Sequence, residues 1–155
     1  MARICIVGEW HQAAVLGACF ASRGHAVIGV ASDERRARDL NAGVPPVHEP
    51  ELPGLMREVL AAGRLRYTTS YADALAGAEY AFIALDTPVA EDDAPVLGPV
   101  LAAAGRMGEA LDGETLVVVT AQVPVGTCER VRALVGEASG RAVPGAYVPE
   151  FLRLG

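Results

Sequence analysis

Short apolar runs alternate along the chain with longer stretches in which apolar residues recur at helical spacing. The apolar runs are rich in β-branched residues and lack an apolar–polar alternation, which is typical of strands covered on both faces in a parallel sheet. Strands are predicted at residues 3–7, 26–30, 65–68, 80–85 and 115–120, with a weaker one at 142–148. Helices are predicted at 13–23, 33–41, 71–76, 96–111 and 127–135.

This order of elements predicts an α/β fold: a Rossmann-like, doubly wound, mostly parallel sheet of about six strands in a three-layer arrangement. The 155 residues are expected to form a single domain, 1–155, because that length suits one core. Ligands of such sheets lie beyond the carboxyl ends of the strands. The site is therefore expected in the segments 8–13, 31–33, 86–93 and 121–126.

Composition excludes several classes of function. The net charge of −6 argues against binding to nucleic acid, which draws on clustered Lys and Arg. No apolar run approaches the ~20 residues of a membrane span, and the first residues lack the features of a signal peptide, so a cytoplasmic protein without membrane contact is expected. The sequence has no Lys for Schiff-base or general-acid chemistry.

Neither the cysteines nor the acidic residues suggest a metal site. Cys5, Cys19 and Cys128 are odd in number and fall in a predicted strand and two predicted helices, so they are expected to be buried thiols. Four carboxylates gather in one loop without the spacing of a calcium-binding loop, so a solvated loop is expected and no metal. These are Asp86, Glu91, Asp92 and Asp93.

The turn after the first predicted strand is an altered dinucleotide-binding loop. In the pattern G-x-G-x-x-G/A, the first Gly makes the turn, the second lets the backbone approach a pyrophosphate, and the third allows close helix packing. Gly8 and Ala13 satisfy the first and third positions. Trp10 holds the second position, where an indole occupies space that a phosphate would use. The loop keeps the signal for the fold and loses much of the signal for binding.

Four segments together resemble one enzyme family. They are the Gly8 turn; Glu49-Pro50 with Ala61-Ala62-Gly63-Arg64-Leu65-Arg66-Tyr67-Thr68; Asp86-Thr87-Pro88; and Val123-Pro124-Val125-Gly126-Thr127 with Pro149-Glu150-Phe151-Leu152-Arg153. In order and spacing they are similar to the N-terminal NAD-binding domain of the UDP-glucose/GDP-mannose dehydrogenase family. The resemblance covers nearly the whole chain.

The resemblance implies an NAD-binding domain that is catalytically incomplete alone. Enzymes of this family oxidise the C6 alcohol of a nucleotide sugar in two hydride transfers. Their nucleophilic Cys, their central helix and their C-terminal sugar-nucleotide domain follow the segment matched here, so these parts are expected to be absent. Glu150, which matches the glutamate of the family's Pro-Glu-Phe motif, is the one catalytic position carried over.

The resemblance also implies weakened cofactor binding. Ala31 stands where the family has an Asp that accepts the ribose hydroxyls of NAD. Among the residues that follow, Ser32, Asp33 and Arg36 are candidate contacts, and Arg35 with Arg36 suits the 2′-phosphate of NADP. The alternative, which we favour, is that residues 33–36 simply begin a helix.

Trp10 and His11 have more than one interpretation. Together with the segment 86–93 they resemble one branch of the family, which would make Trp10 a branch trait. The indole could stack on a nicotinamide or adenine, plug the pyrophosphate site, or serve packing, which we favour. His11 could donate to a phosphate, but a His beside a turn is more often a capping or surface residue.

Two functions follow from these observations. The first is a nucleotide-binding domain with weak affinity for NAD or NADP, acting with another protein chain or left as a remnant. The second is a non-enzymatic scaffold or regulatory protein that binds no cofactor because Trp10 fills the site. The candidate cofactor contacts are Gly8, Trp10, His11, Gln12, Ala13, Ser32, Asp33, Arg36, Thr87, Pro88 and Gln122, the last in place of a family Thr.

Overall fold

The computed structural model describes residues 1–91 and 93–150, so Asp92 and the end of the Pro149–Arg153 motif lie outside the described residues. The strands are β1 (Arg3–Val7), β2 (Ala26–Val30), β3 (Leu65–Thr68), β4 (Tyr80–Ile83), β5 (Leu116–Val119) and β6 (Gly145–Tyr147). The helices are α1 (His11–Ser22), α2 (Glu34–Asn41), α3 (Leu52–Ala61), α4 (Tyr71–Leu75), α5 (Gly98–Ala110) and α6 (Thr127–Ser139).

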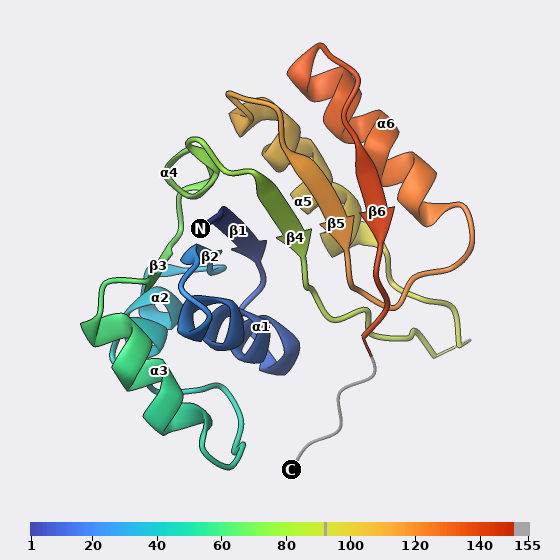
Figure 1. Cartoon of the computed structure of the whole chain (residues 1–155). Helices are drawn as coiled ribbons and strands as arrows, with labels where there is room; N and C mark the ends of the chain where they lie inside the picture. Colours follow the sequence, from blue (N-terminus) through green and yellow to red (C-terminus); the bar gives the residue numbers. More distant parts are fainter. Residues whose placement is uncertain (92, 151–155) are drawn as a thin grey trace.

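The six strands form one sheet in the order β3-β2-β1-β4-β5-β6 (Figure 1), and every neighbouring pair is parallel. The predicted Rossmann-like α/β fold is thus confirmed. Val7, the last residue of β1, pairs with Val30 of β2 on one side and with Ile83 of β4 on the other. The loops after these three strands therefore leave the sheet at one level. The order reverses between β1 and β4, which is where such sheets bind ligands.

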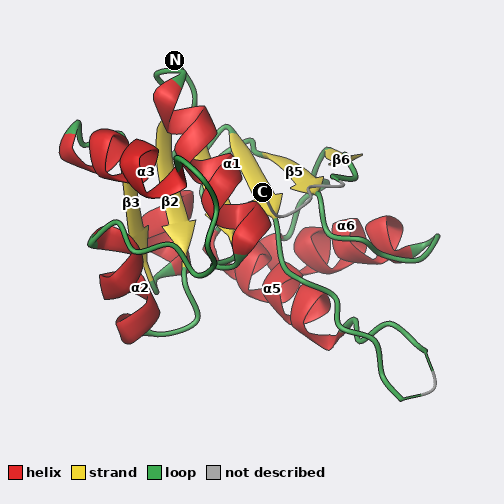
Figure 2. Ribbon diagram, turned by 90° about the horizontal axis from the view of Figure 1, so that it is seen from below, coloured by secondary structure: helices red, strands yellow, loops and turns green. Residues whose placement is uncertain are grey.

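Helices cover both faces of the sheet and give three layers (Figure 2). Ile4 and Ile6 of β1 belong to a core shared with α1 and α3. Cys5 and Val7 of the same strand belong to the opposite core, shared with α4, α5 and α6. Because successive side chains of a strand point to opposite faces, two apolar cores require apolar residues at every position. This is the origin of the unbroken apolar runs in the sequence.

All predicted strands and helices are present, with bounds that shift by a few residues. Strand β6 is shorter than predicted, and α6 runs four residues beyond the predicted end at 135. Only α3 lacks a predicted range. It begins after Glu51, which has a left-handed backbone (φ 66°) and makes no side-chain cap bond. A helix start without a capping side chain offers little signal in the sequence.

The cysteine prediction is right for one residue of three. Cys5 is fully buried, and burial raises the pKa of its thiol to about 12. Cys19 is exposed and Cys128 is half-buried, so the expectation of buried thiols is wrong for these two. In α1 the buried positions include Gly17, Ala18 and Ala21, and Cys19 lies beside that stripe on the solvent side.

Candidate functional site

The turn after β1 requires a glycine at position 8. Gly8 has φ +151°, and its N–H donates to the carbonyl oxygen of Val30 at 3.1 Å. A Cβ atom at this position would lie 2.4 Å from the carbonyl oxygen of Ala84 and 2.9 Å from the Cβ atom of Ala13. Gly8 therefore lies in close contact both with the backbone just after β4 and with Ala13, the other position that keeps a fingerprint residue.

Helix α1 begins at this turn without a side-chain cap. Its N-cap residue is Trp10, and no side chain accepts a hydrogen bond there. In contrast, Asp33 caps α2 and Ser70 caps α4 through bonds to the backbone N–H groups of Arg36 and Asp73. The first N–H groups of a helix are donors suited to phosphate, and the helix dipole favours a negative charge beside them.

A cavity of about 440 Å³ opens at the start of α1, which is a volume typical of sites for small ligands. Its walls come from the segments that follow β1, β4, β5 and β6. The lining residues are Trp10, His11, Gln12, Leu85, Asp86, Thr87, Pro88, Thr120, Ala121, Gln122 and Glu150. The structure thus gathers most of the candidate residues from the sequence, including Glu150, at the point where the strand order reverses. We call this cavity the switch-point pocket.

Two hydrogen bonds join the walls of the switch-point pocket. The hydroxyl of Thr120 lies 3.2 Å from Oε1 of Gln12, linking the end of β5 to α1. The hydroxyl of Thr87 donates to the backbone oxygen of Gln122 at 2.6 Å, linking the loops after β4 and β5. Both bonds use side chains that line the cavity. Thr120 was not among the predicted residues, because a Thr at a strand end carries no motif of its own.

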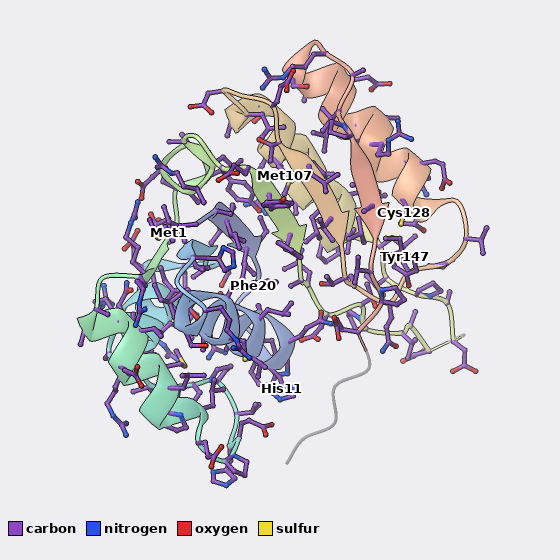
Figure 3. The ribbon with its side chains drawn as sticks, in the orientation of Figure 1. Met1, His11, Phe20, Met107, Cys128 and Tyr147 are labelled. Atoms are coloured by element: carbon purple, nitrogen blue, oxygen red, sulfur yellow. The ribbon has the colours of Figure 1, made fainter. Side chains whose placement is uncertain are left out.

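His11 is not the capping or surface residue expected from the sequence. Its Nε2 atom lies 2.8 Å from Oε2 of Glu49, and the two side chains are only 12% and 20% exposed. The imidazole ties the first turn of α1 to the loop that precedes α3. Figure 3 shows His11 at one end of α1, on the same side of the molecule as the tips of the strand arrows. Loss of surrounding water raises the pKa of Asp86, and the nearby His11 partly offsets that effect.

Trp10 lines the switch-point pocket and is not a core residue. The residue is 42% exposed, so it belongs to neither core, and the favoured packing interpretation stays a prediction. Its backbone is extended (φ −93°, ψ −167°), so the position does not demand glycine for conformational reasons. The difference from a typical loop is the bulk of the indole at the mouth of α1. Stacking on a ligand and plugging the phosphate site both remain predictions.

The candidates after β2 lie apart from the residues that line the pocket. Asp33 accepts the backbone N–H of Arg36 at 2.8 Å, and that bond is the main cause of its lowered pKa. The helix-start interpretation is thus confirmed for Asp33. Arg35 lies 4.0 Å from Asp39 one turn along α2. Arg36 instead faces the turn after β1, where its Nε atom lies 3.7 Å from Oε1 of Glu9.

Glu9 is another residue that was not among the predicted site residues. Its Oε2 atom accepts the backbone N–H of Ser32 at 2.6 Å, and its Oε1 atom accepts the Ser32 hydroxyl at 2.9 Å. The fingerprint leaves this loop position unspecified, so no motif marks it. The carboxylate nevertheless lies at the end of β2, where it is bonded to Ser32, the residue that follows Ala31 in the chain.

The acidic loop after β4 gathers no metal ligands in the part of the chain that the structure describes. No three His, Cys, Asp or Glu side chains converge within residues 1–91 and 93–150 closely enough to hold an ion. One carboxylate of the acidic set, Asp92, lies outside the described residues. The donors assembled at the strand ends are hydroxyls, amides and backbone N–H groups, which suit an organic ligand.

The sequence profile of the UDP-glucose/GDP-mannose dehydrogenase family, NAD binding domain, matches residues 2–155. The chain belongs to this family. It is 41% identical over 158 residues to the UDP-glucose 6-dehydrogenase of Pseudomonas aeruginosa, in a match that covers 99% of this chain and 35% of that enzyme. The resemblance inferred from the four motifs is therefore confirmed.

Solved structures agree with the sequence match. A GDP-mannose dehydrogenase from Pseudomonas aeruginosa has a TM-score of 0.93 and 31% identity, covering 98% of this chain and 37% of that chain. A UDP-glucose dehydrogenase from Pyrobaculum islandicum has a TM-score of 0.93 and 37% identity, covering 100% of this chain and 37% of that chain. The chain thus spans little more than a third of the length of these relatives.

Proposed function

We propose that this chain is the NAD-binding domain of a nucleotide-sugar dehydrogenase and that the dinucleotide binds in the switch-point pocket. One observation carries the proposal: the uncapped start of α1 opens into a cavity of about 440 Å³ where the strand order reverses. A dinucleotide needs an anion-binding helix start beside a cleft for its bases and sugars.

The residues present fit such a ligand. The N–H groups at the start of α1 would hold the pyrophosphate, and the turn at Gly8 brings the chain close to β4 at that place. The polar groups of Thr87, Gln122 and Glu150 line the same cavity and would orient the half of the ligand that lies beyond α1. When bound, NAD would supply the hydride acceptor, while the side chains bind and position it.

The affinity should be weaker than in a loop with the complete fingerprint. Ala31 provides no charge-assisted hydrogen bond to the ribose, and if no other residue supplies that bond, its loss weakens binding by roughly 1.5–3 kcal/mol, or about tenfold or more in Kd. Trp10 places an indole where close approach of a phosphate requires a bare backbone. Both features support binding weaker than the micromolar range.

Oxidation of a nucleotide sugar is proposed only for a larger protein. The UDP-glucose 6-dehydrogenase of Pseudomonas aeruginosa is matched over 35% of its length. The activity named for that relative therefore involves a much longer chain. We infer that the 155 residues act together with such a remainder, supplied by the same polypeptide or by another chain.

Other partners are less well supported. No helix in residues 1–91 and 93–150 is both long and apolar enough to cross a membrane. The net charge of −6 disfavours contact with nucleic acid. The cytoplasmic location expected from the sequence stays a prediction.

A titration with NAD and NADP tests the proposal. Trp10 is the only tryptophan of the chain and lines the pocket, so its fluorescence reports directly on this site. We expect a saturable change with NAD at concentrations above the micromolar range, matched by the heat of binding in calorimetry. Free nicotinamide and AMP, added separately, show which half of the ligand is held. If neither dinucleotide binds, the proposal fails and the scaffold function is favoured.

A further inference from the structure

The carboxylate of Glu9 is held in a specific position between two strand ends. It accepts two hydrogen bonds from Ser32, one from the backbone N–H at 2.6 Å and one from the hydroxyl at 2.9 Å. Arg36 lies 3.7 Å from the same carboxylate. The side chain of Glu9 comes from the turn after β1, whereas Ser32 and Arg36 follow β2. The pairing in register of Val7 with Val30 brings these two loops together.

We propose that Glu9 is the acid that receives the adenosine ribose of NAD and that it discriminates against NADP. This inference rests on the proposed function, because it assumes that the chain binds a dinucleotide whose adenosine half extends from the switch-point pocket to the loop after β2. In Rossmann domains an acid near the end of the second strand accepts the ribose hydroxyls, and an Arg nearby accommodates a 2′-phosphate. Here the second strand is followed by Ala31, and the nearby carboxylate comes from the β1 turn.

The hydrogen bonds that Glu9 already accepts leave acceptor sites on its carboxylate for a ribose. An ionised carboxylate has two oxygens with about four acceptor sites. Ser32 occupies one site on each oxygen of Glu9. One further site on each oxygen is therefore left for a sugar diol, which has two hydroxyl donors. The Glu9 side chain is 23% exposed, so it is partly buried but still reaches the surface.

The same carboxylate opposes a 2′-phosphate. A phosphate carries up to two negative charges and would lie against Glu9, where like charges repel. Without that charge, the groups that now hold Glu9 would be available to the phosphate. The Ser32 N–H, the Ser32 hydroxyl and the Arg36 guanidinium form a set of donors typical of phosphate sites. The hydrogen-bond donors that a 2′-phosphate of NADP needs are thus present, but the Glu9 carboxylate occupies them.

Substitution of Glu9 tests this assignment. We compare the parent chain with Glu9→Gln and Glu9→Ala, and titrate each with NAD and NADP by calorimetry and ligand-observed NMR. Adenosine 2′,5′-bisphosphate and ADP serve as probes of the adenosine half alone. Both variants should bind NAD more weakly than the parent by about tenfold and bind NADP more tightly, which reverses the preference. Glu9→Gln/Arg36→Gln should lose the gain in NADP binding.

Glu34→Gln is the matched control, because it removes one negative charge at the same edge of the sheet. The Glu34 carboxylate accepts a hydrogen bond from Thr69, whereas Ser32 donates to Glu9. The Glu34→Gln variant should leave the affinities for NAD and for NADP within about twofold of those of the parent. Circular dichroism and thermal unfolding establish that each variant is folded.

The outcomes separate this inference from the proposed function. If the parent binds NAD and the Glu9 variants keep the same ratio of NAD to NADP affinity, only the role of Glu9 is overturned. Tighter NAD binding by Glu9→Ala also overturns it, since Glu9 would then obstruct the ribose. If the parent and all variants bind neither dinucleotide, the proposed function itself fails. A reversal of preference that is confined to the Glu9 variants supports both.

Discussion

The Nε2 atom of His11 lies 2.8 Å from Oε2 of Glu49, and this contact joins the first turn of α1 to the loop before α3. The two residues are 38 positions apart in the chain. Since both side chains are largely buried, the pair fixes the position of the helix start that opens into the switch-point pocket.

Removal of this contact should reduce stability. We expect His11→Ala to lower the free energy of unfolding by about 1–3 kcal/mol, because a partly buried carboxylate loses a hydrogen-bond partner. Urea unfolding measures the change. His48→Ala is the control, since His48 lies exposed in the same Pro-rich loop and should have little effect. Equal effects of the two substitutions would contradict the structural role of His11.

Substitution of Trp10 should improve dinucleotide binding. Trp10→Gly removes the indole from the mouth of α1 and restores a bare backbone, so NAD should bind more tightly, as measured by calorimetry. Little stability should be lost, because Trp10 is 42% exposed and Gly is acceptable at an N-cap. If the variant binds no better while NAD quenches the parent's fluorescence, the indole is a ligand contact and the scaffold function fails.

Two glycines should respond to Ala in opposite directions. Gly8 has φ +151°, and Gly8→Ala would place a Cβ atom 2.4 Å from a backbone oxygen. We therefore expect the free energy of unfolding to fall by about 3 kcal/mol or more. A Cβ atom at Gly105, within α5, would have open space around it, so Gly105→Ala should raise the free energy of unfolding by about 0.5–1 kcal/mol. Thermal unfolding of both variants measures the difference. A tolerated Gly8→Ala would show that the turn differs from the one described.

The ion pair of Arg66 and Asp73 predicts a pH-dependent stability. Their two hydrogen bonds, at 2.5 and 2.6 Å, are the main cause of the lowered pKa of Asp73. A lowered pKa means that the pair stabilises the fold above about pH 4 and that this contribution is lost as the pH falls through the folded-state value.

Asp73→Asn should therefore lower the Tm at pH 7, and the difference from the parent should close below about pH 4. The pair is exposed and screened by solvent, so the effect should be at most about 1 kcal/mol. Glu114→Gln, which changes the net charge equally at another exposed site, serves as the control. A difference that persists in acid would assign the effect to something other than the ion pair.

The chain alone should not oxidise a nucleotide sugar. Among the described residues, none of the three cysteines lines the switch-point pocket: Cys5 is buried in the sheet, and Cys19 and Cys128 line other cavities. Incubation with NAD or NADP and UDP-glucose or GDP-mannose should give no rise in nicotinamide absorbance. A complete dehydrogenase serves as the positive control. Steady reduction by the chain alone would refute this prediction.

The fold was largely predictable from the sequence because its determinants are local and repeated. A parallel strand with two covered faces needs apolar residues at every position, and Ile4, Cys5 and Ile6 already show this in the sequence. Gly8 marks the turn after β1, and collinear motifs identify the family. Helix α3 was the exception, since it begins at an uncapped, left-handed Glu51.

The partners of the site residues depended on the tertiary structure. The sequence alone determined the six strands, the turn at Gly8 and the altered loop position held by Trp10. It did not determine that Glu9 contacts Ser32 or that His11 contacts Glu49, because these pairs form between loops that meet only when the strand ends align. Local patterns report which face of an element is buried. Contacts between loop side chains depend on register and helix position, which only the assembled sheet establishes.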